Sequence, residues 1–66
     1  MKVVYQGDET ETSQTTVGGF LAERHVPVAS SIVEYAGEVY PPGADLASVA
    51  LRDGAPLEVF RLTAGG

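Results

Sequence analysis

The sequence predicts one small α+β domain, and three observations lead to that prediction. The chain has 66 residues, which leaves room for a single domain against a usual size of about 100–150 residues. Runs of β-branched and aromatic residues, separated by turn residues, surround one stretch with helical spacing, in the order strand, strand, helix, strand, strand, strand. Hydrophobic residues make up 44% of the chain and charged residues 20%, a composition typical of a folded domain.

The first predicted element is a β-hairpin. Residues 1–6 have β-branched and aromatic character, and the turn residues Gly7-Asp8 follow them before a threonine-rich stretch. Side chains alternate between the two faces of a strand, so Met1, Val3 and Tyr5 share one face. We expect that face to contact the core.

A helix is predicted after the hairpin. Thr15 or Thr16 can supply the N-cap, because a threonine side-chain oxygen accepts a hydrogen bond from a free backbone N–H of the first turn. Val17, Phe20 and Leu21 then fall at positions i, i+3 and i+4, which places them on one helix face. That face is expected to pack on the sheet.

Two glycines and one proline limit this helix. Gly18 and Gly19 lie in its first turn, where each costs about 1 kcal/mol relative to alanine. Their small size favours close packing against the sheet. Pro27 disfavours helical geometry in the residue before it, so the helix is expected to end near Val26.

A second hairpin and a helical turn are predicted in the middle of the chain. Residues 32–35 form a strand, Ala36-Gly37 a tight turn, and residues 39–40 a short returning strand that Pro41-Pro42 ends. Residues 44–51 have apolar positions at helical spacing but are too few for a full helix. A single helical turn is expected there.

The last strand carries the most informative pattern. The turn residues Asp53-Gly54 precede it, and it spans residues 57–62. Leu57 and Val59 share one face, whereas Phe60 and the other even-numbered positions share the opposite face. Either Phe60 is exposed and the odd-numbered residues are core, or the reverse holds, and alternation by itself leaves both arrangements open.

Charge and composition exclude several function classes. Nine acidic residues against four basic ones give a net charge of −5, the wrong sign for binding nucleic acid or an anionic membrane surface. The chain has no cysteine, which removes thiol catalysis and zinc–thiolate or iron–sulfur sites. No segment approaches the roughly 18 residues of a membrane span or the hydrophobic part of a signal peptide. We expect a cytoplasmic binding or carrier module rather than a self-contained enzyme.

The remaining polar candidates favour structural interpretations. His25 is the single histidine and lies near the expected helix C-terminus, so no metal site is predicted. Asp8, Glu9 and Glu11 are interpreted as a solvated face of the first hairpin, and docking against a basic groove is the alternative.

The end of the chain resembles a known family. Leu51, the turn Asp53-Gly54, the strand of residues 57–60 and the terminal Ala64-Gly65-Gly66 match that family's ending in type and spacing, and residues 34–41 resemble its hairpin followed by proline. On these motifs the chain resembles the β-grasp sulfur carrier proteins and, within them, the thiamine biosynthesis carriers (ThiS). The resemblance covers essentially the whole sequence.

The resemblance implies a fold and a chemistry. The fold is β-grasp (ubiquitin-like), a mixed sheet of four to five strands packed against one helix over residues 1–62, followed by a flexible tail, residues 63–66. In the family an E1-like adenylating enzyme (ThiF type) uses ATP to adenylate the C-terminal glycine, here Gly66. A sulfur donor such as a cysteine desulfurase then supplies the sulfur of a thiocarboxylate, which passes to thiazole synthase (ThiG type). The chain itself is implied to be a substrate that binds no cofactor and no metal.

The residues expected to contact partners lie in and beside the tail. They are Gly65, Ala64, Thr63, Leu62 and Phe60, with Val4 if the first and last strands are neighbours. Three alternatives stay open: a carrier for another pathway (molybdopterin, cysteine or a secondary metabolite), a ubiquitin-like protein modifier, and an interaction domain whose terminal glycines are incidental.

Overall fold

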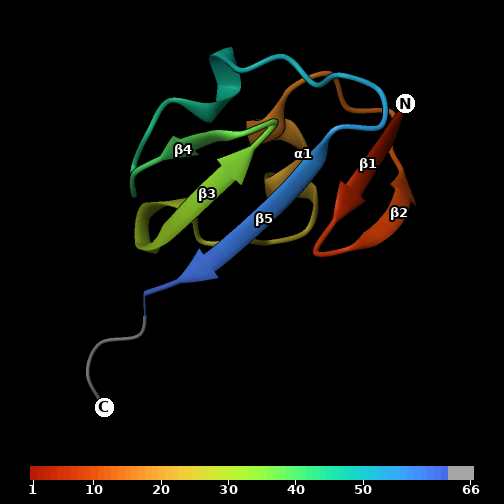
Figure 1. Ribbon diagram of the computed structural model, residues 1–66. Helices are drawn as coiled ribbons and strands as arrows, with labels where there is room; N and C mark the ends of the chain where they lie inside the picture. The colour runs from red at the N-terminus through yellow and green to blue at the C-terminus, as the bar shows by residue number, and fades with distance from the viewer. Residues whose placement is uncertain (63–66) are drawn as a thin grey trace.

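The computed structural model describes residues 1–62, and this part of the chain forms a five-stranded mixed sheet with one α-helix on one face (Figure 1). The elements are β1 (Lys2–Tyr5), β2 (Asp8–Glu11), α1 (Val17–Glu23), the 3₁₀ helix η1 (Val28–Ser30), β3 (Ser31–Tyr35), β4 (Glu38–Tyr40), the 3₁₀ helix η2 (Leu46–Ser48) and β5 (Pro56–Arg61). The strand order is β2-β1-β5-β3-β4, with β1 and β5 parallel and the other pairs antiparallel. This is a β-grasp fold, and the predicted order of elements is confirmed.

The first hairpin turns one residue earlier than the sequence indicated. The turn residues are Gln6 and Gly7, with φ of 50° and 88°, and Asp8 already belongs to β2, opposite Tyr5. A two-residue hairpin loop of this kind needs positive φ at both central positions, because only then does its twist match that of the strands. The prediction of a Gly7-Asp8 turn is therefore wrong by one position.

The core lies between the sheet and α1. Ten hydrophobic residues are buried there: Val3, Val17, Phe20, Leu21, Val33, Tyr35, Leu46, Leu51, Leu57 and Val59. In β1 the expected inward face holds for Val3, while Tyr5 is half-buried with its ring edge-on to Phe20 at 5.3 Å. Met1 lies just before β1 and is 45% exposed, so the expectation of an inward position does not hold for it.

α1 begins as predicted but ends early. Thr16 is the N-cap, and its side-chain oxygen accepts from the Gly19 N–H at 3.0 Å. At the other end, His25 has φ of 59°, and the Val26 N–H donates to the Leu21 carbonyl at 3.0 Å. A left-handed residue followed by an N–H that donates back to the last helical turn is the Schellman motif, which ends a helix. The predicted end near Val26 is thus wrong, because a non-glycine residue takes the left-handed position.

Gly18 makes the close approach that its size predicted, but to a different element. A Cβ on Gly18 would lie 2.8 Å from the Ala47 backbone nitrogen and 2.9 Å from the Leu46 carbonyl carbon, both in η2. The expected packing against the sheet is replaced by packing against η2, which is the helical turn predicted within residues 44–51. The helix start and this loop are therefore in backbone contact.

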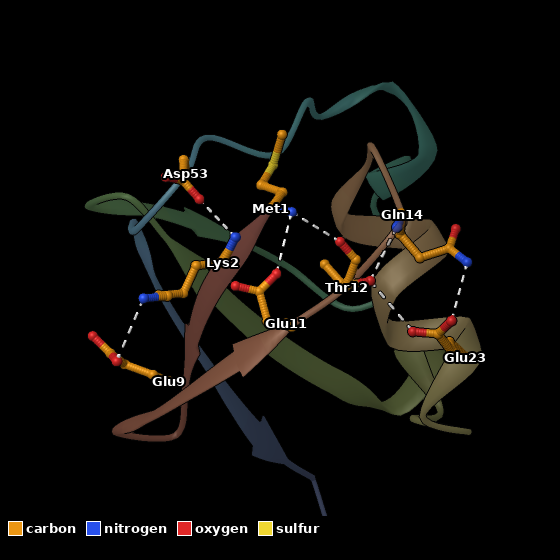
Figure 2. A network of polar contacts seen from close by, with 8 residues as sticks. All are labelled: Met1, Lys2, Glu9, Glu11, Thr12, Gln14, Glu23 and Asp53. Carbon is orange, nitrogen blue, oxygen red and sulfur yellow. Dashed lines mark hydrogen bonds and ion pairs between the residues drawn. The ribbon is translucent and has the colours of Figure 1, made fainter.

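The start of β1 is held by polar contacts, which Figure 2 shows together. The Met1 amine donates to the Thr12 carbonyl at 3.1 Å and lies 3.5 Å from Glu11 Oε2. Lys2 Nζ lies 3.7 Å from Glu9 Oε1 across the hairpin. Glu9 and Glu11 thus lie on an exposed hairpin face, as interpreted, and each has a cationic partner within the domain. Asp8 is exposed too, but alternation places it on the other face, opposite Tyr5.

Two further carboxylates join the hairpin to other parts of the fold (Figure 2). Glu23 of α1 accepts from the Thr12 hydroxyl at 3.4 Å and from Gln14 Nε2 at 3.3 Å. Asp53 accepts from the Lys2 backbone N–H at 2.6 Å. Both side chains therefore have a structural use.

Among residues 1–62, no helix has the length and apolar character that crossing a membrane requires.

Candidate functional site

β5 has one buried face and one bare face. Leu57 and Val59 point into the core under α1, whereas Phe60 and Leu62 are each 51% exposed. The alternative left open by the sequence is thereby resolved: Phe60 is a surface residue. Its exposure follows from strand alternation, since α1 covers only the face that the odd-numbered residues share.

The strand register determines which residues adjoin Phe60. In β3, Ile32 lies directly opposite Phe60, and Glu34 lies opposite Glu58. β1 is the other neighbour of β5, as expected, but Val4 lies opposite Pro56. Pro56 and Phe60 are four residues apart, about 13 Å along a strand. Val4 therefore shares the bare face, while the half-buried side chain next to Phe60 is Ile32.

We use the name β3–β5 surface for five exposed or half-buried residues on the bare face, four within these two strands and one just beyond the end of β5. They are Ile32, Glu34, Glu58, Phe60 and Leu62. Sequence reasoning included Phe60 and Leu62 and missed the two residues from β3. Their contribution depends on the register between β3 and β5, whose paired residues are 22 to 30 positions apart in the chain, from Tyr35 with Leu57 to Ser31 with Arg61. The sequence carries no local signal for that register.

Gln6 fixes the part of β5 that lies beyond the end of β1. Its side-chain amide accepts from the Val59 N–H and donates to the Val59 carbonyl, both at 3.0 Å. On the other side, the Leu62 N–H donates to the Ser30 carbonyl at 2.9 Å. A glutamine side chain thus takes the place of one more strand residue, and β5 stays hydrogen-bonded on both sides near its end. Sequence reasoning missed this role of Gln6.

The two glutamates of the β3–β5 surface differ from the carboxylates of the first hairpin. Glu34 and Glu58 are both exposed and lie directly opposite each other on neighbouring strands. Within residues 1–62 neither has an ion-pair partner, while Glu9 and Glu11 each have one. The surface beside Phe60 is therefore negatively charged as well as apolar.

The predicted tail residues lie outside the part of the chain that the structure describes. They are Thr63, Ala64, Gly65 and Gly66. Four residues span at most about 14 Å when fully extended, at roughly 3.3–3.6 Å each. Any group that acts on Gly66 must therefore approach the domain close to Leu62, which is the last described residue and belongs to the β3–β5 surface.

The described residues include a cavity but no cluster of metal ligands. The cavity, about 300 Å³, lies between α1, η1 and η2 and is lined mainly by small apolar side chains such as Ala22, Val26 and Ala44. In residues 1–62, no three His, Asp or Glu side chains gather as a metal ion would require. His25 instead takes the left-handed position that ends α1.

Comparisons with known proteins give one informative result. No family model matches the chain, and no curated protein matches it. Among solved structures, the chain is similar to the thiamine biosynthesis protein ThiS from Geobacter metallireducens, with a TM-score of 0.76, 24% sequence identity and coverage of 100% of both chains. At this identity the match establishes a shared fold over the full length of both chains.

Proposed function

We propose that this chain is a sulfur carrier that bears sulfur as a thiocarboxylate on Gly66, with Gly66 as its carboxyl terminus, and that it serves thiamine thiazole formation in the cytoplasm. One observation carries the proposal: β5 holds Phe60 and Leu62 exposed immediately before Ala64-Gly65-Gly66. The shared fold with ThiS and the matching terminal motif support the same assignment.

In the proposed chemistry, the terminal carboxylate of Gly66 is the one group of the chain that reacts. A terminal carboxyl has a pKa of about 3.3–3.7, so at neutral pH it is ionised. One oxygen attacks the α-phosphorus of ATP and releases pyrophosphate. Hydrosulfide, which a thiol reductant releases from the donor's persulfide, then attacks the carbonyl carbon of the acyl-adenylate, and AMP leaves to give the thiocarboxylate. Glycines at positions 65 and 66 have no Cβ to obstruct either approach.

The catalytic groups belong to partners in this proposal. The ATP site lies on an E1-like adenylating enzyme of the ThiF type, the sulfur comes from a donor such as a cysteine desulfurase, and thiazole synthase of the ThiG type receives it. The carrier is a substrate rather than an enzyme. It supplies a terminal carboxylate and a docking surface within about 14 Å of that carboxylate.

The terminal chemistry is tested by mass spectrometry. The purified chain is incubated with a ThiF-type adenylating enzyme, ATP and sodium sulfide, and its intact mass should increase by the difference between sulfur and oxygen. A variant lacking Gly66 keeps every residue of the described domain, so it should unfold at the same temperature but remain unmodified. Modification of that variant would contradict a terminal mechanism.

The docking surface is tested with a matched pair of variants. Phe60→Thr removes the aromatic ring next to the tail, and Val39→Thr removes a 61% exposed valine from the edge strand β4. Both variants place threonine, a β-branched residue that suits a strand, on the surface. We expect Phe60→Thr to bind the adenylating enzyme at least about tenfold more weakly, since aromatic anchors supply much of an interface's binding energy. Equal affinity for both variants would place the docking surface elsewhere.

The alternatives differ in product. A ubiquitin-like modifier would form amides with lysine side chains, which appear as larger bands on a denaturing gel. A carrier for molybdopterin, cysteine or a secondary metabolite would form the same thiocarboxylate but fail to deliver sulfur to thiazole synthase. Transfer of sulfur from the isolated thiocarboxylate to a ThiG-type enzyme separates these cases.

A further inference from the structure

The β3–β5 surface contains a pair of like charges in a position that costs stability. Ala36 and Pro56 are joined by a backbone hydrogen bond of 3.0 Å, and Leu62 and Ser30 by one of 2.9 Å, so even-numbered positions form the hydrogen-bonded pairs of this antiparallel ladder. Glu34 and Glu58 form one such pair. Residues in this relation have Cβ atoms about 4.5–5.5 Å apart, and like charges directly opposite are destabilising.

No basic side chain of the described residues lies within ion-pair distance of Glu34 or Glu58. Lys2 pairs with Glu9 on the same face of the sheet but toward its β2 edge, and the Arg24 guanidinium lies over the rings of Tyr5 and Phe20, at 5.3 and 4.8 Å from their centroids. Within residues 1–62, neither Glu34 nor Glu58 has an ion-pair or hydrogen-bond partner, although four other carboxylates do. The pair is left for solvent or for a partner.

The surroundings of the pair indicate which cation fits it. Phe60 is the next residue on the same face of β5 after Glu58, and Ile32 has the same relation to Glu34 in β3, a spacing of about 6.6–6.8 Å. A guanidinium is planar, has five N–H donors that can serve two carboxylates at once, and stacks on aromatic rings. An ammonium group is a compact, strongly hydrated charge and cannot combine these contacts as well.

We propose that Glu34 and Glu58 together receive an arginine side chain of the adenylating partner, with the guanidinium lying between the two carboxylates and against the Phe60 ring. The inference rests on the proposed function, because that function supplies the partner. It adds how the two proteins would recognise each other: an arginine of the partner would lie among apolar side chains of the carrier, whose net charge is −5. The repulsion between Glu34 and Glu58 is relieved when the arginine binds.

The experiment compares two double variants of equal charge. E34Q/E58Q removes both carboxylates of the β3–β5 surface. D8N/E38Q removes two exposed carboxylates from the other face of the sheet, the one that α1 covers. Asp8 of β2 is paired there with Tyr5, and Glu38 of β4 is paired with Tyr35. Dissociation constants for the ThiF-type adenylating enzyme, without ATP, are measured at low and at physiological salt. Thermal unfolding of both variants is recorded.

The expected result is specific to the first variant. E34Q/E58Q should bind about tenfold or more weakly and lose most of the salt dependence, because a charged pair in the interface has been removed. Its unfolding temperature should equal or exceed that of the wild type. D8N/E38Q should bind within about twofold of the wild type, since it changes only the overall charge.

Two results overturn the inference while leaving the proposed function intact. If wild type acquires a thiocarboxylate but both double variants weaken binding equally, only net charge matters. If neither weakens binding, the pair takes no part in docking. Failure of the wild-type chain to be activated at all is a different outcome, because it overturns the proposed function and with it the partner on which this inference rests.

Discussion

The two faces of β5 contrast within a single strand. Leu57 and Val59 are buried against α1, while Phe60 and Leu62, which alternate with them, are half exposed on a face that no helix covers. The residues of the first face stabilise the fold, and those of the second contribute little to it. Apolar residues that are exposed next to one another often mark a site where a partner binds, and this is the physical reason for placing the docking surface there.

The carboxylates of the domain also differ between two regions. Around the first hairpin, Glu9, Glu11 and Asp53 contact cationic groups or backbone N–H groups of the domain. On the β3–β5 surface, Glu34 and Glu58 face each other. Acidic side chains thus support the fold in one region and oppose it in the other.

The largest expected difference is between substitutions on the two faces of β5. Leu57→Ala should lower the free energy of unfolding by about 2–5 kcal/mol, because it leaves a cavity in the core. Phe60→Ala should lower it by at most about 1 kcal/mol, because the half-exposed ring loses only its cross-strand contact with Ile32. Urea denaturation followed by circular dichroism measures both. Comparable losses for the two variants would show that both faces are core and would break the comparison.

The contact between α1 and η2 gives the next largest effect. Gly18→Ala places a methyl group 2.8 Å from the Ala47 backbone nitrogen, and such overpacking should cost about 1–3 kcal/mol. Gly19→Ala is the matched control, since its methyl group would meet side-chain atoms rather than backbone: those of Gln14, which can move, and the Thr16 hydroxyl at 3.1 Å. Alanine also favours the helix. The two melting temperatures should therefore differ. A melting temperature of Gly18→Ala above that of Gly19→Ala would contradict the close approach of α1 to η2.

Gln6 allows a test of how the end of β5 is held. Gln6→Ala removes both hydrogen bonds to Val59 and should cost about 0.5–1.5 kcal/mol, because water can reach this exposed position. Hydrogen exchange at the Val59 amide should become faster, while exchange at Val33 in the middle of β3 should follow only the global change. Unchanged exchange at Val59 would show that the side chain does not substitute for a strand residue.

The smallest effect concerns the like-charged pair. Glu58→Gln should raise the free energy of unfolding by roughly 0.2–1 kcal/mol at low salt, because it removes the repulsion from Glu34. The gain should shrink in high salt, where exposed charges are screened. Glu9→Gln should act in the opposite direction, since Glu9 pairs with Lys2. A loss of stability in Glu58→Gln would indicate that the pair is not repulsive.

Local patterns were sufficient to predict most of the fold. An N-cap at Thr15 or Thr16, the turn at Ala36-Gly37 and the shared face of Leu57 and Val59 all depend on residues close together in the sequence, and the structure confirms them. Which face of β5 is buried was left open by alternation and required the structure. The end of α1 was predicted too late, because His25 occupies a left-handed position that glycine more often takes.

The parts of the candidate site that were missed depend on contacts between distant segments. Ile32 adjoins Phe60, and Glu34 faces Glu58, only through the register of β3 with β5. Gln6 reaches Val59 across 53 positions of sequence. Alternation within a strand shows which residues share a face, but it does not show which residue of another strand lies opposite, so these neighbours required the structure.

One measurement tests the central claim most directly. The wild-type chain is incubated with the ThiF-type enzyme, ATP and sodium sulfide, and the product is fragmented in the mass spectrometer to locate the change. A replacement of one oxygen by sulfur on Gly66, dependent on ATP and slower in Phe60→Thr than in Val39→Thr, is the predicted result. An unchanged mass, or a modification on any residue of the described domain, would contradict the account.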